Sequence, residues 1–147
     1  MNNGKKVLII GLTLLTGFTY SAGAVTKDMK KVVDEALEFS VKQSMSMFNE
    51  MKDQKGILPR TAKDGKMITC ESAWWTSGFY PGSLWYCYEY SNDPQVRAAA
   101  EEMTSRVEKQ KYTTSNHDVG FIINCSFGNG YPVSYTHLRA HETGRNL

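Results

Sequence analysis

The chain is poor in the residue types from which most metal and nucleic-acid sites are built. It has three histidines and three cysteines among 147 residues, and its formal net charge is only +2. So small an excess of positive charge gives no basic field for nucleic acid. His137 and His141 lie in the last stretch, so a site built from several histidines is excluded from the middle of the chain. We therefore expect no metal, no other cofactor and no nucleic-acid partner.

Long hydrophobic runs are also scarce. The run from Val7 to Leu15 is well short of the ~20 residues that cross a bilayer. It follows Lys5 and Lys6 and precedes the small residues at 22–24, which is the pattern of a secretory signal peptide. A membrane anchor is the alternative that the short run disfavours. We expect residues 1–24 to be removed and the mature protein to be periplasmic or secreted from a bacterium, without membrane contact.

The last sixteen residues, 132–147, read differently from the rest. They have no apolar period and are enriched in histidine and arginine. Residues 134–143 resemble the translated adaptor sequence that ends many truncated metagenomic reading frames; a natural polar tail is the alternative. We predict one domain over residues 25–131 and a non-native tail after it. Resequencing the gene past the codon for Tyr131 would test this.

The middle of the chain has a globular composition, 41% hydrophobic overall, and helical periodicity. Steps of three and four between apolar residues predict a helix over 27–52, and these residues form its stripe: Val33, Leu37, Val41, Met45, Phe48 and Met51. Residues 56–69 are predicted to be a loop, with a turn at Asp64 and Gly65.

Three more helices are predicted, over residues 79–90, 94–109 and 119–127. Asp93 can cap the second of these, and Pro94 fits its first turn. The apolar side of that helix consists of Val96, Ala99, Ala100, Met103 and Val107. Glycines at 128 and 130 are expected to stop the last helix. The sequence therefore predicts an all-α fold of stacked helical hairpins.

The cysteines Cys70, Cys87 and Cys125 lack the spacing of a zinc site. Two of them could pair in an exported protein. Because Cys87 and Cys125 lie in apolar helical runs, we favour free, buried thiols.

One segment is strongly aromatic: eight of the 17 residues from Trp74 to Tyr90 are Trp, Tyr or Phe. Aromatic faces stack on the apolar faces of sugar rings. Trp75 precedes the helix and is a candidate for such binding, with core packing as the alternative. Three aromatic residues inside the helix are expected to lie in the core: Trp85, Tyr86 and Tyr88.

A second segment combines His117 with Asp118 just before an apolar helix. Asp118 could simply cap that helix. Its carboxylate, next to the one histidine of the middle of the chain, could also take part in proton transfer. We expect Trp75 and Asp118 to face one cavity.

Both segments together resemble the unsaturated glucuronyl hydrolases of glycoside hydrolase family 88. The order and spacing match over about residues 25–131. The matching residues are Trp75, Thr76, Gly78, Phe79, Gly82, Leu84, Trp85, Tyr88, Glu89, Tyr90, Asp93, His117, Asp118, Gly120 and Phe121.

The resemblance implies the N-terminal portion of an (α/α)6 barrel, cut short. It implies removal of a 4,5-unsaturated uronic acid from the non-reducing end of lyase-generated oligosaccharides, without a cofactor. Asp118 corresponds to the second catalytic aspartate, Trp75 to a sugar-stacking residue, and His117 to a further residue of the substrate pocket. The principal acid of the family lies beyond Tyr131, so we expect the 147-residue chain alone to be inactive.

Two readings compete with this one. An unsaturated rhamnogalacturonyl hydrolase has a similar fold and chemistry, and a helical sugar-binding protein without activity would keep only the aromatic pocket. Some family members carry acidic residues where this chain has Trp74 and Ser77. These differences concern the rim of the pocket, and so the preference for sulfate and linkage.

Overall fold

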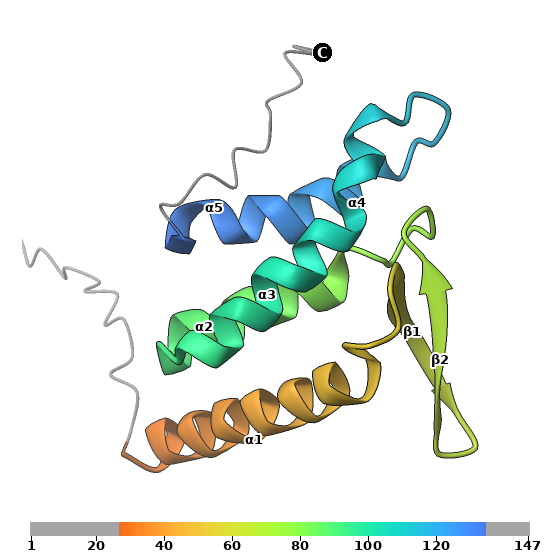
Figure 1. Ribbon diagram of the computed structural model, residues 1–147. Coiled ribbons are helices and arrows are strands. Elements are labelled where there is room, and N and C mark those ends of the chain that lie inside the picture. Colours follow the sequence, from red (N-terminus) through yellow and green to blue (C-terminus); the bar gives the residue numbers. More distant parts are fainter. Residues whose placement is uncertain (1–26, 135–147) are drawn as a thin grey trace, which may run out of the picture.

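The structure is a computed structural model that describes residues 27–134. Most of these residues are helical, which agrees with the predicted fold class. Figure 1 shows the long helices lying side by side, with a β-hairpin across one end. The helical elements are α1 (Lys27–Met51), α2 (Phe79–Ser91), α3 (Pro94–Val107), η1 (Glu108–Tyr112), α4 (Val119–Ile123), η2 (Asn124–Gly128) and α5 (Asn129–Ser134).

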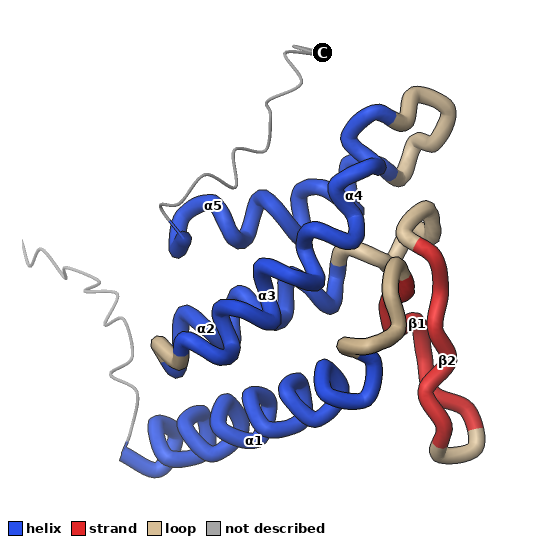
Figure 2. The backbone as a smooth tube through the Cα atoms, viewed as in Figure 1, coloured by secondary structure: helices blue, strands red, loops and turns tan. Residues whose placement is uncertain are grey.

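The loop predicted over residues 56–69 is wrong, because this segment forms most of an antiparallel hairpin. Its strands are β1 (Ile57–Lys63) and β2 (Lys66–Glu71), drawn in red in Figure 2. The turn at Asp64 and Gly65 is confirmed, and both residues have positive φ, 51° and 72°. A two-residue turn of this kind matches the twist of paired strands. The turn signal was therefore a hairpin signal.

The main core lies between α2 and α3. All five predicted apolar residues of α3 are fully buried. Trp85 is 1% exposed, and its indole N–H donates to Thr104 Oγ1 over 2.9 Å. Tyr88 is partly buried and packs against this core. The prediction for Tyr86 is wrong: it is 59% exposed, and its hydroxyl reaches Asn129 of α5 instead of the core.

Helix α1 has the predicted bounds to within a residue but covers the core only with its C-terminal half. Of the predicted stripe, Val33 is exposed and Met51 is fully buried, so the stripe is buried only in part. Tyr80 attaches α2 to α1 by donating its hydroxyl hydrogen to Ser44 O over 2.7 Å. Burial raises the pKa of Tyr80 well above its usual range, which keeps this donor protonated.

The predicted helix stop at residues 128–130 is also wrong. The backbone stays helical through η2, which is a π-turn, and continues in α5 to Ser134. Gly130 is needed for packing, since a Cβ there would lie 2.6 Å from the Trp85 ring. Val133 packs on the same core.

The predicted signal peptide and residues 135–147 of the predicted tail lie outside the described residues. Within residues 27–134, no helix is long and apolar enough to span a membrane.

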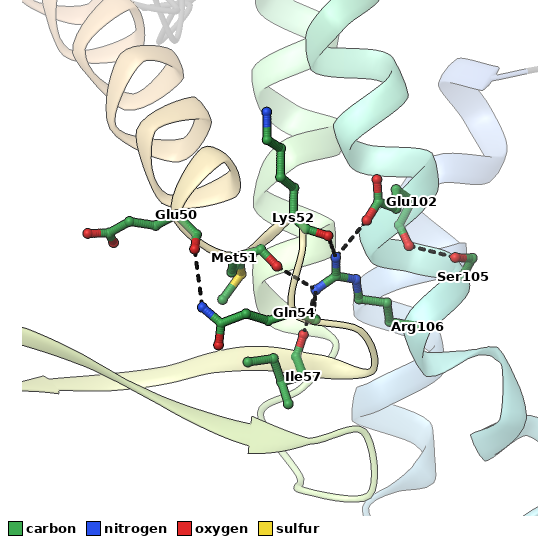
Figure 3. A network of polar contacts seen from close by, with 8 residues as sticks. All are labelled: Glu50, Met51, Lys52, Gln54, Ile57, Glu102, Ser105 and Arg106. Atoms are coloured by element: carbon green, nitrogen blue, oxygen red, sulfur yellow. Dashed lines mark hydrogen bonds and ion pairs between the residues drawn. The ribbon is translucent and has the colours of Figure 1, made fainter.

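A single arginine joins the end of α1 to α3 (Figure 3). The side chain of Arg106 is 6% exposed and pairs with Glu102 over 2.6 Å. Its guanidinium also donates to carbonyl oxygens at the end of α1 and the start of β1: those of Met51, Lys52, Gln54 and Ile57. The carbonyls at a helix end have no partner within the helix. Arg106 therefore supplies donors that also fix the direction in which the hairpin leaves α1.

We predict that Arg106→Lys lowers the free energy of unfolding by about 1–3 kcal/mol, measured by urea denaturation. The ammonium group of lysine cannot reproduce the planar arrangement of N–H donors in the guanidinium, so some of the carbonyls would lose their partner. Arg97→Lys is the matched control. Arg97 lies on the same helix and pairs with Glu101 at the same spacing, but its side chain is 31% exposed, so we expect a loss below about 1 kcal/mol. Equal losses in the two variants would contradict the special role of Arg106.

Candidate functional site

Trp75 lies in the turn at residues 72–78, between β2 and α2. Its side chain is 45% exposed and meets the ring of Phe79 edge to face, with centroids 5.7 Å apart. The turn is held by its own backbone: Trp74 N–H donates to Glu71 O over 3.0 Å, and Ser77 N–H donates to Trp74 O over 2.9 Å. Trp75 is therefore a solvent-exposed aromatic side chain on a turn fixed by hydrogen bonds, as stacking on a sugar ring requires.

Three buried polar residues support this turn through hydrogen bonds. The hydroxyl of Ser77 donates to Ser72 O over 2.7 Å, and Gln110 Nε2 donates to Ser72 Oγ over 2.8 Å. Ser72 and Ser77 are 0% exposed, and Gln110 is 5% exposed. We expected Ser77, where some family members carry an acidic residue, to lie at the rim of the pocket. That expectation is wrong, because Ser77 is buried and supports the turn. Sequence periodicity gives no signal for such a cluster, since its members come from distant segments.

Trp74 is covered by a cation from the hairpin. The guanidinium carbon of Arg60 lies 3.9 Å from the centre of the Trp74 ring. The strand register shifts between Pro59 and Thr61, so Arg60 is the extra residue of a β-bulge. Bulges commonly redirect a side chain in this way. The hairpin and the Trp75 turn therefore share one surface.

Asp118 immediately precedes α4, and His117 lies beside it. His117 Nε2 is 3.3 Å from Asp118 Oδ1, with the histidine side chain 93% exposed and the aspartate side chain 25% exposed. The side chain of Asp118 makes no capping hydrogen bond to the helix. The simple capping role is therefore not what Asp118 does, and its carboxylate is left for other contacts.

Asn116 connects the two predicted site segments. Its Oδ1 accepts from Asp118 N–H over 2.9 Å, and its Nδ2 donates to Ala73 O over 3.3 Å. In Figure 2 the two tan segments that contain these residues lie at the same end of the molecule. Asn116 was not among the residues that the sequence predicted for the site. An asparagine whose side chain accepts from the backbone N–H two residues further on is a known turn signal, and Asn116 could have been found on that ground.

A glycine seam packs α2 against the segment that carries Asp118. A Cβ at Gly78 would lie 2.1 Å from Ile122 O, and one at Gly82 would lie 2.1 Å from Cys125 O. Real Cβ atoms do not come so close to backbone oxygens. These two glycines of the matching motif are therefore required for helix packing. The close backbone approach that Gly82 allows is to another helix.

Aromatic side chains also remain exposed on the two packed elements. They are Phe79 and Tyr86 on α2, Phe121 on α4 and Tyr131 on α5. The Tyr86 hydroxyl donates to Asn129 Oδ1 over 3.3 Å, which links α2 to α5.

An open cavity of about 990 Å³ lies between α1, the hairpin and the start of α2. Thr76 and Phe79 line it, together with Arg60 and Lys66. Thr76 Oγ1 is buried and has no hydrogen-bond partner within the described residues. Trp75, His117 and Asp118 do not line this cavity. That Trp75 and Asp118 share a cavity therefore stays a prediction.

The cysteines are free thiols, as favoured from the sequence, but only Cys87 is buried, whereas Cys70 and Cys125 are partly exposed. Burial raises the pKa of Cys70 and of Cys125, so both resist ionisation at neutral pH. Over residues 27–134, no three His, Cys, Asp or Glu side chains gather closely enough to hold a metal ion.

Comparison with known proteins supports the resemblance. No family profile matches the chain. An unsaturated glucuronyl hydrolase of Formosa agariphila is 46% identical over 56 residues, which are 38% of this chain and 14% of that protein. An unsaturated chondroitin disaccharide hydrolase of Streptococcus pyogenes is 30% identical over 95 residues, which are 61% of this chain and 23% of that protein.

A crystal structure agrees with these two relatives. It is that of an unsaturated glucuronyl hydrolase specific for heparin, which matches with a TM-score of 0.57 and 34% identity over 69% of this chain and 28% of that one. The similarity to unsaturated glucuronyl hydrolases is thus confirmed, and so is the fold, a portion of an α/α barrel. The chain spans only 14% to 28% of the length of these proteins.

We predict that Gly78→Ala lowers the free energy of unfolding by about 2–3 kcal/mol, because the new methyl group forces α2 away from Ile122. Gly120→Ala is the control, since a Cβ there meets nothing within 4 Å. That variant is expected to gain about 0.5–1 kcal/mol from helix propensity. Urea denaturation of both variants checks the sign. A neutral Gly78→Ala would contradict the seam.

Proposed function

We propose that the whole protein is a glycoside hydrolase that removes a 4,5-unsaturated uronic acid from the non-reducing end of lyase-generated oligosaccharides. The observation that supports this most is the direct connection between the two motif segments. Asn116 hydrogen-bonds both to the Trp75 turn and to Asp118, and Gly78 brings α2 against α4. Residues 43 positions apart are thereby combined into one candidate sugar site.

The reaction is hydration of the C4=C5 bond. An acid delivers a proton to C4 and water adds its oxygen at C5, which gives a hemiketal. The hemiketal opens, and the neighbouring sugar departs. A glycosidase of the ordinary kind instead needs two carboxylates that flank the anomeric carbon.

Asp118 is proposed as the second carboxylate of this reaction. Its side chain is partly buried and makes no capping bond, so it can accept hydrogen bonds from sugar hydroxyls. A carboxylate close to the principal acid also raises the proton affinity of that acid, because two like charges in proximity disfavour ionisation. A group that keeps its proton at neutral pH can deliver it to C4.

Trp75 and His117 are proposed to bind the sugar. The exposed face of Trp75 offers a stacking surface, and its edge contact with Phe79 holds the ring orientation. His117 is exposed beside Asp118 and can donate a hydrogen bond to the sugar or accept one from it, at the part of the sugar that Asp118 is proposed to contact.

A second candidate is an unsaturated rhamnogalacturonyl hydrolase, whose substrate derives from pectin. The relatives reported above are an unsaturated glucuronyl hydrolase and an unsaturated chondroitin disaccharide hydrolase, which favours the glucuronyl class here. Side-by-side assays with a glycosaminoglycan disaccharide and a pectin-derived one separate the two. A sugar-binding protein without activity would bind either sugar and consume neither.

We also propose that the protein is exported, on the basis of the charged and apolar pattern at residues 1–24. The mature N-terminus at Val25, read by Edman degradation of protein recovered from the periplasm or medium, would support this. An intact Met1 on the recovered protein would contradict it.

We predict that Asp118→Asn lowers kcat/KM for an unsaturated glucuronyl disaccharide by more than about tenfold, a change above ~1.4 kcal/mol. The amide has the same shape but cannot carry the negative charge. The measurement is the loss of ultraviolet absorbance of the double bond, in protein expressed from the complete gene.

Asp93→Asn is the matched control for this substitution. Asp93 caps α3 by accepting from Gln95 N–H over 2.8 Å, and asparagine caps equally well, so activity should be unchanged. Wild-type rates in Asp118→Asn would remove Asp118 from the proposed mechanism.

A further inference from the structure

We propose that Asn116 is a positioning residue that fixes Trp75 relative to Asp118, and so sets the geometry of the sugar site without touching the sugar. This inference rests on the function proposed above and deepens it. It assigns a role in that site to a residue outside the matching motif.

Asn116 uses both ends of its side-chain amide. The oxygen accepts from the N–H of Asp118 over 2.9 Å, which shapes the turn into α4. The nitrogen donates to the carbonyl of Ala73 over 3.3 Å, across 43 residues of sequence. Ala73 lies two residues before Trp75. One planar group thereby relates the backbone of the Trp75 turn to the backbone of Asp118.

The turn that Asn116 holds is stiff, so a displacement of Ala73 is passed on to Trp75. Ser72, next to Ala73, is fixed by Ser77 through its carbonyl and by Gln110 through its hydroxyl. All three are buried. The hydrogen bond from Asn116 therefore sets the outer part of this stiff turn, at Ala73, relative to the Asp118 segment.

The other end of the connection is stiff as well. The carbonyl of Asp118 accepts from Phe121 N–H over 2.9 Å and from Ile122 N–H over 3.2 Å. Ile122 is fully buried and lies against Gly78 at the start of α2. The glycine seam therefore fixes how close the two segments come, and Asn116 fixes how the two outer ends are oriented.

The bond from Asn116 to Ala73 is accessible to solvent, so it contributes little to global stability. Its effect on the site is larger, because small displacements of positioned groups are costly in catalysis. This difference separates a positioning role from a structural one. Loss of the bond should lower activity much more than it lowers the urea midpoint of unfolding.

Asn116→Ser tests this directly. The serine hydroxyl can still accept from Asp118 N–H in the same kind of turn, but it is too short to reach Ala73. In protein from the complete gene we expect kcat/KM for an unsaturated glucuronyl disaccharide to fall by about tenfold or more, with an unchanged urea midpoint. Asn49→Ser is the matched control, since Asn49 is exposed on α1; activity should be unchanged there.

A double-mutant cycle with Trp75→Ala shows whether Asn116 acts through Trp75. If it does, adding Asn116→Ser to Trp75→Ala lowers kcat/KM by less than about threefold, since the position of an absent ring no longer matters. A full additional tenfold loss in that background would overturn the proposal.

A measurement without substrate keeps this inference separate from the proposed function. With ¹⁵N-labelled tryptophan, and with Trp75→Phe used for assignment, Asn116→Ser should shift the Trp75 indole resonance and leave that of buried Trp85 in place. If the wild-type protein does not consume the disaccharide, the proposed function fails, while a shifted Trp75 resonance still supports the connection. An unmoved Trp75 resonance overturns the positioning role, whatever the activity.

Discussion

The backbone contact between α2 and the helical segment that follows Asp118 determines the rest of the site. With glycine at 78 and 82, the two segments meet at distances that no side chain would permit. That contact brings the Trp75 turn to the start of α4. Only then can one asparagine bridge Ala73 and Asp118. The site is thus a product of helix packing first and of polar contacts second.

Arg106 has the corresponding role at the other side of the hairpin. It satisfies carbonyls at the end of α1 with donors from α3, and so sets where β1 begins. Since β2 leads directly into the Trp75 turn, the hairpin is held at both ends, by Arg106 at its start and by the Ser72 cluster after its end. The aromatic turn is therefore held through the hairpin by α3 and through Gln110 by η1, although it lies on the surface.

The helices could be predicted from the sequence, because apolar periodicity and capping residues are local. The α3 core and the cap at Asp93 were confirmed for that reason. The hairpin was missed because its short strands carry no clear alternation, so the predicted turn at Asp64 was placed within a loop. The helix stop at Gly130 was wrong, since that glycine makes room for the Trp85 ring, which is a tertiary requirement. The prediction for Tyr86 was wrong because a single sequence does not show which aromatic residues of a helix the rest of the fold covers. The motif pointed to Trp75 and Asp118, but the residues that connect them came only from the three-dimensional contacts.

The bulge at Arg60 has a consequence for how the protein could diverge. The hairpin beyond the bulge forms a wall of the cavity next to α1, with Thr61, Ala62 and Lys66 among its lining residues. Since a bulge bends and twists its strand, a homologue one residue shorter at this position would have a straighter hairpin, and the wall would turn with it. Single-residue length variation in β1 would therefore reshape the cavity in two ways, through the course of the hairpin and through the loss of Arg60 from the lining.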